Sequence, residues 1–267
     1  MSVIIRNPWT ELRRFTNARL ALGRAGDSLP TREVLAFGLA HAQARDAVHA
    51  SLEIEKLARD LAEFGYESRA VKSAVHDRAE YLRRPDLGRK LSTESRDLLK
   101  LSLKRHGFSH ANQAKKDSSV LAPEGWDVVF IIADGLSAIA PSRHTVPVLR
   151  AIAPMLHDWH IGPIIIATQA RVGLGDEIGE LLQAEMTVML IGERPGLSSP
   201  DSLGIYLTYM PSIGRTDADR NCISNIHSMG LSYEDAASKL HHMMLAARRA
   251  GLSGVMLKDE SDQLRLP

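Results

Sequence analysis

The chain has 267 residues and a mass of 29.4 kDa; 44% of the residues are hydrophobic, 24% charged and 5% aromatic. This composition indicates a globular protein with a core and excludes a disordered tail or a fibre. No apolar run reaches the ~18–20 residues of a membrane helix, and Met1 to Trp9 lack the apolar stretch of a secretory signal. The single cysteine, Cys222, excludes an internal disulfide and favours a reducing, cytoplasmic compartment.

The net charge of +1 hides two halves of opposite sign. Residues 1–120 hold 22 Lys and Arg against 15 Asp and Glu, whereas residues 121–267 hold 11 against 17. This asymmetry predicts two units with different surfaces. The basic half raises nucleic-acid binding as an alternative. Acidic residues are interspersed throughout it, however, and no nucleic-acid motif is present, so a solvated helical surface or a protein interface is favoured.

Residues 1–110 predict a helical N-terminal domain. Thr31 follows a turn and is the expected N-cap of a helix with Glu33 in its first turn. A clearer helix begins at Ile54, where apolar residues recur every three or four positions, and Gly65 provides its end. The remaining residues of this domain keep a helix-forming, charged character. Polar residues without periodicity then predict a linker over residues 111–125.

Residues 126–267 predict a Rossmann-like α/β domain with a mostly parallel sheet. Continuous apolar runs separated by segments of helical length are typical of strands buried on both faces. The expected strands are 128–133, 164–167 and 187–191. The expected helices are 146–156, 176–183 and 233–250.

Three polar, glycine-containing segments follow these strands, at 134–137, 169–175 and 192–197. In open α/β sheets, ligands bind beyond the carboxyl ends of the strands, and glycine lets the backbone approach a ligand closely. These segments are therefore candidate binding loops. The alternative is that they are tight turns that close βα units.

A dinucleotide site is one cofactor alternative, because Gly173, Gly175 and Gly179 follow a predicted strand. Their spacing is one residue too long for the G-x-G-x-x-G pattern, and the nearest acid at a suitable distance, Glu193, lies in a Gly-Pro loop. An NAD-linked oxidoreductase is therefore disfavoured.

A metal site would draw on Cys222, His227, His241 and His242. No second Cys-x-x-Cys or His-x-x-x-His arm accompanies them, and adjacent histidines on a helix point about 100° apart. A solvated helix face explains the histidine pair better. Nucleophilic catalysis by Cys222 would need His227 or Asp219 within reach, which the sequence leaves open.

The segment Asp158-Trp159-His160-Ile161-Gly162 is similar to the D-x-H-x-x-G motif of base-off cobalamin proteins, in which the histidine ligates cobalt. Its glycine is one position early, and the segment precedes a predicted strand instead of following one. His160 is therefore not expected to be a cobalt ligand.

Several blocks in the same order resemble the small subunit of ethanolamine ammonia-lyase, over about residues 10–260. Among them are Ile-Ala-Asp-Gly-Leu-Ser-Ala at 132–138, Gln-Ala-Arg-Val-Gly-Leu-Gly at 169–175, Leu-Ile-Gly-Glu-Arg-Pro-Gly-Leu at 190–197 and Asp-Arg-Asn-Cys-Ile-Ser-Asn-Ile-His at 219–227. The resemblance implies an adenosylcobalamin-dependent lyase that converts ethanolamine to acetaldehyde and ammonia by a radical mechanism. In this family a large barrel subunit performs the chemistry, and the small subunit closes the base-on cofactor site at the interface.

The resemblance also implies three cofactor contacts, at Val172, Glu193 and Cys222, and neither a catalytic residue nor a metal ligand in this chain. Val172 would offer apolar or backbone contact, and Glu193 would accept hydrogen bonds from cofactor donors. Cys222 would pack as a small polarizable group. The expected assembly has six large and six small subunits, with the basic N-terminal helices docked on the large subunit. It is expected in the cytoplasm, and the resemblance leaves open whether a bacterial microcompartment encloses it.

A rival hypothesis of another class is a stand-alone α/β module that binds a nucleotide or metabolite and kept the motifs without the partner. A small subunit separated from its large subunit should expose a large apolar patch. The two hypotheses therefore differ in whether this chain needs a barrel subunit.

Overall fold

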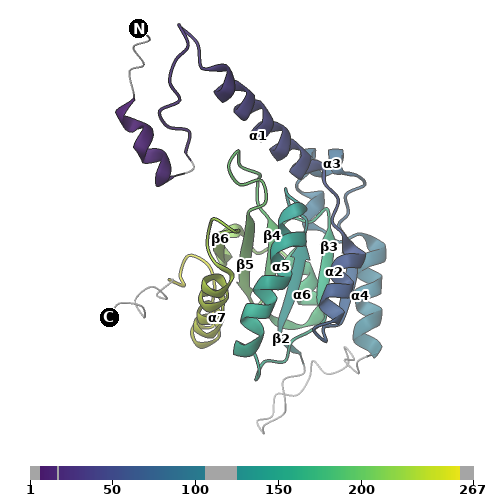
Figure 1. Ribbon diagram of the computed structural model, residues 1–267. Helices are drawn as coiled ribbons and strands as arrows, with labels where there is room; N and C mark the ends of the chain where they lie inside the picture. Colours follow the sequence, from purple (N-terminus) through teal and green to yellow (C-terminus); the bar gives the residue numbers. More distant parts are fainter. Residues whose placement is uncertain (1–6, 17, 106–124, 259–267) are drawn as a thin grey trace, which may run out of the picture.

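The computed structural model describes residues 7–16, 18–105 and 125–258. Within these residues, six strands form one sheet in the order β1-β3-β2-β4-β5-β6 (Figure 1). Strands β1, β3, β2 and β4 are parallel, and β5 runs antiparallel to β4 and β6. The strands are β1 (Ser68–Lys72), β2 (Trp126–Ala133), β3 (Ile164–Thr168), β4 (Ala184–Gly192), β5 (Leu203–Tyr209) and β6 (Arg220–Ile226). The α/β class with a mostly parallel sheet is thus confirmed.

Helices cover both faces of this sheet. Helices α2, α5 and α7 pack on one face, and α4 and α6 pack on the other. The α-helices are α1 (Thr31–His49), α2 (Ile54–Ala62), α3 (Arg78–Arg83), α4 (Thr93–Arg105), α5 (Ile139–Ile152), α6 (Leu174–Leu182) and α7 (Tyr233–Ala250). Short 3₁₀ helices are η1 (Pro8–Arg14), η2 (Leu87–Arg89), η3 (Ala153–Met155) and η4 (Asp217–Asp219). Among the described residues, no helix is long and apolar enough to cross a membrane.

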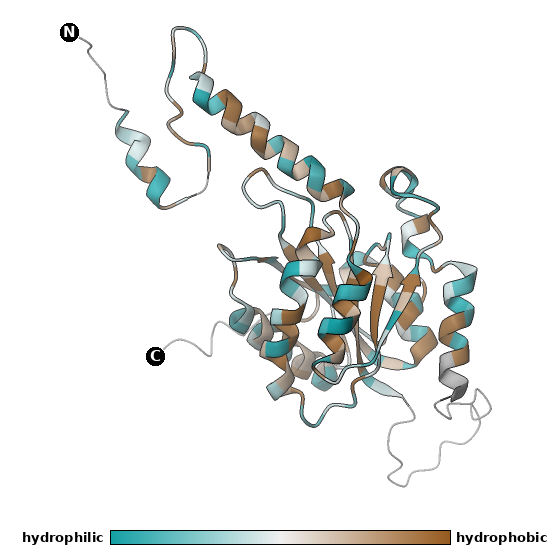
Figure 2. Ribbon diagram, turned by 45° about the vertical axis from the view of Figure 1, so that its right-hand side comes forward, coloured by the Kyte–Doolittle hydropathy of each residue, from teal (hydrophilic) through white to brown (hydrophobic). Residues whose placement is uncertain are grey.

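The central strand β2 shows why the sheet has two cores. Successive side chains of a strand point to opposite faces. Phe130 and Ile132 therefore enter the core under α2, α5 and α7, whereas Val129 and Ile131 enter the core under α4 and α6. Because both faces are buried, the strand is apolar at consecutive positions, and Figure 2 shows much of the central sheet in brown.

The three predicted strands are present, as β2, β3 and β4. The late helix is confirmed as Tyr233–Ala250, and it ends at Gly251, whose positive φ of 68° suits a residue without a side chain. One predicted cap is wrong: Thr31 is the first residue of α1, and Pro30 is its N-cap. Proline fits there because its fixed φ suits the start of a helix.

The helical prediction for residues 1–110 is wrong at Ser68–Lys72, which form β1 and pair with β3 in the main sheet. In this short edge strand only Val71 is fully buried, so no apolar run marks it. The linker predicted at 111–125 lies outside the described residues, apart from Gly125. The division into units at 1–110 and 126–267 stays a prediction.

The connections place a crevice at the carboxyl edge of the sheet. The chain leaves β2 toward α5 on one face, and it leaves the neighbouring strand β3 toward α6 on the other face. Such a reversal separates the two loops and opens a space between them. The predicted binding loops 134–137 and 169–175 lie on either side of this point.

Candidate functional site

A cavity of about 360 Å³ opens at the carboxyl edge of the sheet. Its walls come from the loops that follow β2, β3 and β4, with the last two residues of β4 and one residue each from α3 and β5. The lining residues are Tyr81, Gly135, Leu136, Arg171, Val172, Ile191, Gly192, Glu193, Arg194 and Tyr206. All three loops that the sequence predicts as binding loops therefore meet at one site.

Asp134 joins the loops after β2 and β3. Its carboxylate accepts hydrogen bonds from the backbone amides of Gln169, at 2.9 Å, and Ala170, at 3.0 Å. Burial raises the pKa of Asp134, although these amides and the Arg78 guanidinium oppose the shift. Arg78 donates to the carbonyl of Gly135 at 2.9 Å and lies 3.4 Å from Asp134. The cavity wall is thus held by side chains from several elements and is not a loose turn.

Val172 and Arg171 form the wall that follows β3. Val172 is half-buried and packs on the core beneath α6. The backbone amide of Arg171 donates to the carbonyl of Gly88 at 2.8 Å, and Tyr81 Oη donates to the carbonyl of Ala170 at 3.0 Å. These bonds fix the backbone that presents Val172 to the cavity.

Arg171 adds positive charge to the same wall. Its guanidinium lies 4.2 Å from the centre of the Tyr81 ring, and the Arg78 guanidinium lies 4.6 Å from that ring. The Arg171 Nη2 donates to the carbonyl of Tyr81 at 3.2 Å. Its buried Nε has no hydrogen-bond partner in the described part of the chain. The cavity wall therefore contains a cation and a buried donor that is not satisfied within the chain.

Glu193 lies on the opposite wall, directly after β4. Ser202 Oγ donates a hydrogen bond to its Oε2, and the backbone amide of Asn225 donates to the same oxygen at 3.3 Å. Gly204 lies beneath the carboxylate, and a Cβ at that position would lie 3.0 Å from Glu193 Oε1. The glycine thus permits the close approach that positions the acceptor.

Cys222 lies one strand further, beside Tyr206 of the cavity lining. The two residues are paired across β5 and β6. Desolvation and the charge of Glu193 raise the pKa of the Cys222 thiol, while its hydrogen bond to Tyr206 opposes the shift. Cys222 is exposed beside the cavity, and a neutral thiol is a poor nucleophile, so its surroundings do not activate it for nucleophilic chemistry.

The structure therefore brings the three predicted site residues to one region: Val172 and Glu193 line the cavity, and Cys222 adjoins it through Tyr206. Sequence reasoning did not select Arg171 or Tyr81. Arg171 could have been found, because it lies inside the Gln-Ala-Arg-Val block. Tyr81 lies outside every recognised block, so no sequence signal marked it.

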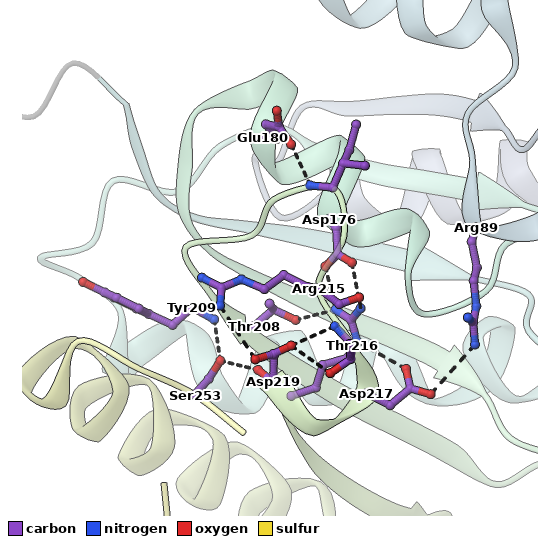
Figure 3. A network of polar contacts seen from close by, with 12 residues as sticks. Arg89, Asp176, Glu180, Thr208, Tyr209, Arg215, Thr216, Asp217, Asp219 and Ser253 are labelled. Atoms are coloured by element: carbon purple, nitrogen blue, oxygen red, sulfur yellow. Dashed lines mark hydrogen bonds and ion pairs between the residues drawn. The ribbon is translucent and has the colours of Figure 1, made fainter. Parts of the chain in front are cut away.

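A second cavity, of about 640 Å³, adjoins the start of α6 and the loop before β6. One of its lining residues is the buried Arg220, which donates to Asp176 at 2.6 and 2.7 Å and to Thr208 at 3.1 Å. Figure 3 shows Asp176 and Thr208 in this network, together with Asp217, which pairs with Arg89 at 3.8 Å. The network fastens β6 to α6.

The same region bears on the dinucleotide alternative. The first turn of α6 carries Asp176 and Glu177, both buried. Glu177 accepts from Arg96 at 2.6 Å and from the backbone amide of Leu91 at 2.8 Å. A pyrophosphate at this helix N-terminus would meet two carboxylates instead of free amides. Gly179 instead permits close packing, because a Cβ there would clash with Pro211 and Thr187.

The histidines of the metal alternative do not converge. His227 Nε2 lies 2.9 Å from Asn225 Oδ1. In the part of the chain that the structure describes, no group of three His, Cys, Asp or Glu residues is arranged to hold a metal ion. His160 lies before β3, at the opposite edge from the cavity, where its ring is tilted by 39° against that of Trp126, with ring centres 4.3 Å apart.

Comparisons with known proteins agree with the motif blocks. The family model described as ethanolamine ammonia-lyase light chain (EutC) matches residues 6–258. The small subunit of ethanolamine ammonia-lyase from Pseudomonas fluorescens is 52% identical over 257 residues, which cover 96% of this chain and 88% of the relative. The protein of the same name from Azotobacter vinelandii is 51% identical over 262 residues, covering 97% and 91%.

A further protein of this name, from Pseudomonas syringae pv. tomato, is 49% identical over 257 residues, covering 96% of this chain and 84% of the relative. The matches extend over both the sheet and the N-terminal residues. The chain therefore belongs to the ethanolamine ammonia-lyase light-chain family and is the small subunit of a lyase.

Proposed function

We propose that this chain closes the adenosylcobalamin site of an ethanolamine ammonia-lyase at its interface with the large subunit. Val172, Glu193 and Cys222 are the proposed contacts of the cofactor. The observation that carries the proposal is their convergence at the carboxyl-edge cavity, from three separate segments of the chain.

The residues present suit a cobalamin. The corrin ring is largely apolar, and Val172 offers an apolar contact at the cavity wall. Amide side chains surround the corrin and supply both donors and acceptors. Glu193 can accept from such amides, and the positive charge of Arg171 at the cavity wall favours the phosphate of the nucleotide tail.

The size of the cavity supports a shared site. Its volume of about 360 Å³ is near the lower end of small-molecule pockets. A cobalamin is much larger, so this chain would enclose only part of it, and a second protein must cover the rest. The relatives are named small subunits, which implies a large subunit as that partner. The proposal also includes an assembly of six large and six small chains in the cytoplasm, with or without a surrounding bacterial microcompartment.

In this arrangement, the bound cofactor supplies the radical that starts the conversion of ethanolamine to acetaldehyde and ammonia. The chain's own residues hold and orient the cofactor and keep water away from one side of it. Glu193 would remain an acceptor, held by Ser202. Cys222 would pack as a neutral thiol, in keeping with its raised pKa.

Reconstitution tests the proposal. The chain is expressed with the large subunit of the same genome, mixed with adenosylcobalamin and assayed for acetaldehyde release. Activity is expected only when both subunits are present. A stable chain that binds neither the large subunit nor cobalamin would overturn the proposal and favour the stand-alone binding module.

Glu193→Ala tests the cofactor contact itself. The loss of a charged acceptor should weaken retention of cyanocobalamin by the two-subunit complex about tenfold, as expected for one hydrogen bond to a charged group. Retention is measured by equilibrium dialysis, which does not depend on turnover. Glu63→Ala, at an exposed position on the opposite edge of the sheet, is the matched control. Equal retention by both variants would remove Glu193 from the site.

A further inference from the structure

One loop carries both Glu193 and the side chain that donates to it. The β4–β5 loop, residues 193–202, begins with Glu193 directly after β4 and ends with Ser202 directly before β5. Ser202 Oγ donates to the Glu193 carboxylate, and the Glu193 amide donates to the Ser202 carbonyl at 2.9 Å. The orientation of the carboxylate therefore depends on what holds the end of this loop.

The tip of the β4–β5 loop contributes little to its position. Residues 193–202 are irregular, and Gly196, Leu197 and Ser198 are exposed. Within the tip, the Gly196 amide donates to the carbonyl of Ser199 at 3.1 Å. An irregular surface loop relies on contacts with neighbouring elements for a fixed conformation. Such contacts lie at the end of the loop, where it returns to β5.

The returning end of the loop is attached to the start of α5. Ser137, just before α5, is fully buried, and its Oγ donates to the carbonyl of Pro200 at 2.8 Å. Asp201, the next residue, pairs with Arg143 of α5 at 2.9 Å. The Arg143 side chain is 62% exposed, and an ion pair with so open a partner is weak. A second, better shielded partner of Asp201 is therefore significant.

His144 is that shielded partner. Its side chain is 6% exposed, with Nε2 lying 3.4 Å from Asp201 Oδ2 and Nδ1 lying 2.9 Å from Tyr233 Oη. Burial lowers the pKa of His144, which keeps the ring neutral. A carboxylate only accepts hydrogen bonds, so the ring proton belongs on Nε2. Nδ1 is then an acceptor, and the Tyr233 hydroxyl donates to it.

These contacts form one polar chain from the helices to the cavity. Tyr233 donates to His144, and His144 donates to Asp201. Asp201 is followed in the sequence by Ser202, which donates to Glu193. Helices α5 and α7, which carry the histidine and the tyrosine, pack on each other. The packed helices thus hold the loop end that orients the carboxylate.

We propose that Asp201 and His144 are positioning residues for the proposed cofactor site. They hold the end of the β4–β5 loop, and Ser202, the next residue, thereby keeps the Glu193 carboxylate at the cavity wall. This inference rests on the proposed function, because it takes Glu193 as a contact of the cofactor. Within the described chain, neither Asp201 nor His144 lines the cavity, so both act through the loop.

A double-mutant cycle in the two-subunit complex is the main test. Asp201→Ala should weaken retention of cyanocobalamin about fivefold, because the Glu193 acceptor loses its fixed orientation. In the Glu193→Ala background the same substitution should change retention by less than about twofold, because no carboxylate is left to position. Retention is measured by equilibrium dialysis. An equal effect of Asp201→Ala in both backgrounds would overturn the proposal.

Asp127→Ala is the matched control, at the opposite edge of the sheet. Asp127 and Asp201 have side chains that are 16% and 18% exposed, and each pairs with an arginine, at 2.8 and 2.9 Å. Asp127 also holds a loop, through the backbone amide of His160 at 2.7 Å. The control should lose similar thermal stability and keep its retention. Equal losses of retention in the two variants would show that destabilisation, and not position, causes the effect.

Two substitutions of His144 separate its hydrogen bonds from its packing. A glutamine amide can donate to Asp201 and accept from Tyr233, as the neutral ring does, whereas leucine can do neither. His144→Leu should therefore weaken retention about threefold, and His144→Gln should restore most of the loss. Equal retention by the two variants would show that these hydrogen bonds do not position the loop.

Failure of this inference differs from failure of the proposed function. If the unchanged complex does not retain cyanocobalamin, or if Glu193→Ala retains it fully, the proposed contact at Glu193 is wrong. If Glu193→Ala weakens retention and Asp201→Ala does not, this inference alone is wrong. Should Asp201→Ala fail to fold, Asp201→Asn, which keeps the size of the side chain, replaces it in the same cycle with the same expected dependence on Glu193.

Discussion

Helix α1 is longer than α5, and the two helices have opposite surroundings. Helix α5, with 14 residues, buries seven of them against the sheet and α7. Helix α1, with 19 residues, buries two. Both contain alanine, leucine and valine, so the presence of these residues does not separate them. The difference lies in the partner: the chain itself supplies the partner of α5, and it does not supply one for most of α1.

This contrast divides the molecule into two regions. The body, residues 50–105 and 125–258, is stable by its own packing. The arm, the described residues within 7–49, has an apolar surface that is available for binding. The body surrounds the sheet and holds the proposed cofactor contacts. Side-chain truncations in the body should therefore change the free energy of unfolding, and truncations in the arm should change association. Each prediction below compares the two regions by one measurable quantity, starting with the largest expected effect.

The largest difference between the two regions is expected in how much an ion pair contributes to the free energy of unfolding. Arg220 and Asp176 have side chains that are 2% and 5% exposed, whereas the arm pair Arg13 and Glu33 is more open. Arg220→Met leaves Asp176 buried without its partner and should lower the free energy of unfolding by about 3–5 kcal/mol. Arg13→Met should cost less than about 1 kcal/mol. Urea denaturation measures both.

A second variant isolates the cause of the Arg220 effect. If the penalty arises from the unpaired carboxylate, combining Arg220→Met with Asp176→Leu should restore most of the lost stability. A double variant that is no more stable than Arg220→Met would instead show that the packing of the arginine stem carries the effect.

Apolar truncation gives the next contrast. Leu190→Ala removes a side chain of β4 that is fully buried, and it should lower the free energy of unfolding by about 2–5 kcal/mol. Leu35→Ala removes an exposed side chain from α1 and should change it by less than about 0.5 kcal/mol. The isolated chain is used for both denaturation curves. Equal losses would mean that α1 is packed on the body, which would end the distinction between body and arm.

The pH dependence of the body gives the smallest effect. His144 of α5 lies 2.9 Å from Tyr233 Oη, and burial lowers the pKa of His144 below its ordinary value of 6.5. The unfolded chain therefore binds this proton more readily. The stability contributed by neutral His144 is complete above about pH 6.5 and is lost as the pH falls through the lower folded pKa.

His144→Gln tests this contribution. Between about pH 7 and pH 5, the free energy of unfolding should fall less steeply in the variant than in the unchanged chain, because the variant has no imidazole to protonate. Identical slopes for the two proteins would assign the pH dependence to other groups.

The strands that the sequence predicted are the ones buried on both faces. Val128 to Ala133 are apolar without interruption because two helical layers cover β2. Strands β1 and β6 lie at the edges of the sheet, and in β6 only Ile223 and Ile226 are buried apolar positions. Polar residues between them remove the continuous run, so β6 carries no comparable local signal. The apolar strand β5 was also missed, since Gly204 interrupts it beside a bulge.

For the site, the motif blocks led to Val172, Glu193 and Cys222, but not to their surroundings. The pairing of Tyr206 with Cys222 depends on the register of two antiparallel strands. The bonds from Asp134 to the loop after β3 depend on the order of strands in the sheet. Neither quantity is encoded by local spacing, because each joins residues that are distant in the sequence.

The sequence by itself determined the family, the α/β class, the central strands and the three residues proposed to contact the cofactor, since these leave runs or motifs of consecutive residues. Only the tertiary structure decided that the three residues meet at one cavity, that Arg171 has an unpaired donor there, and that α1 is exposed. Burial and proximity depend on which distant segments pack together. An apolar helix such as α1 therefore has the same local pattern whether its partner lies in its own chain or in another.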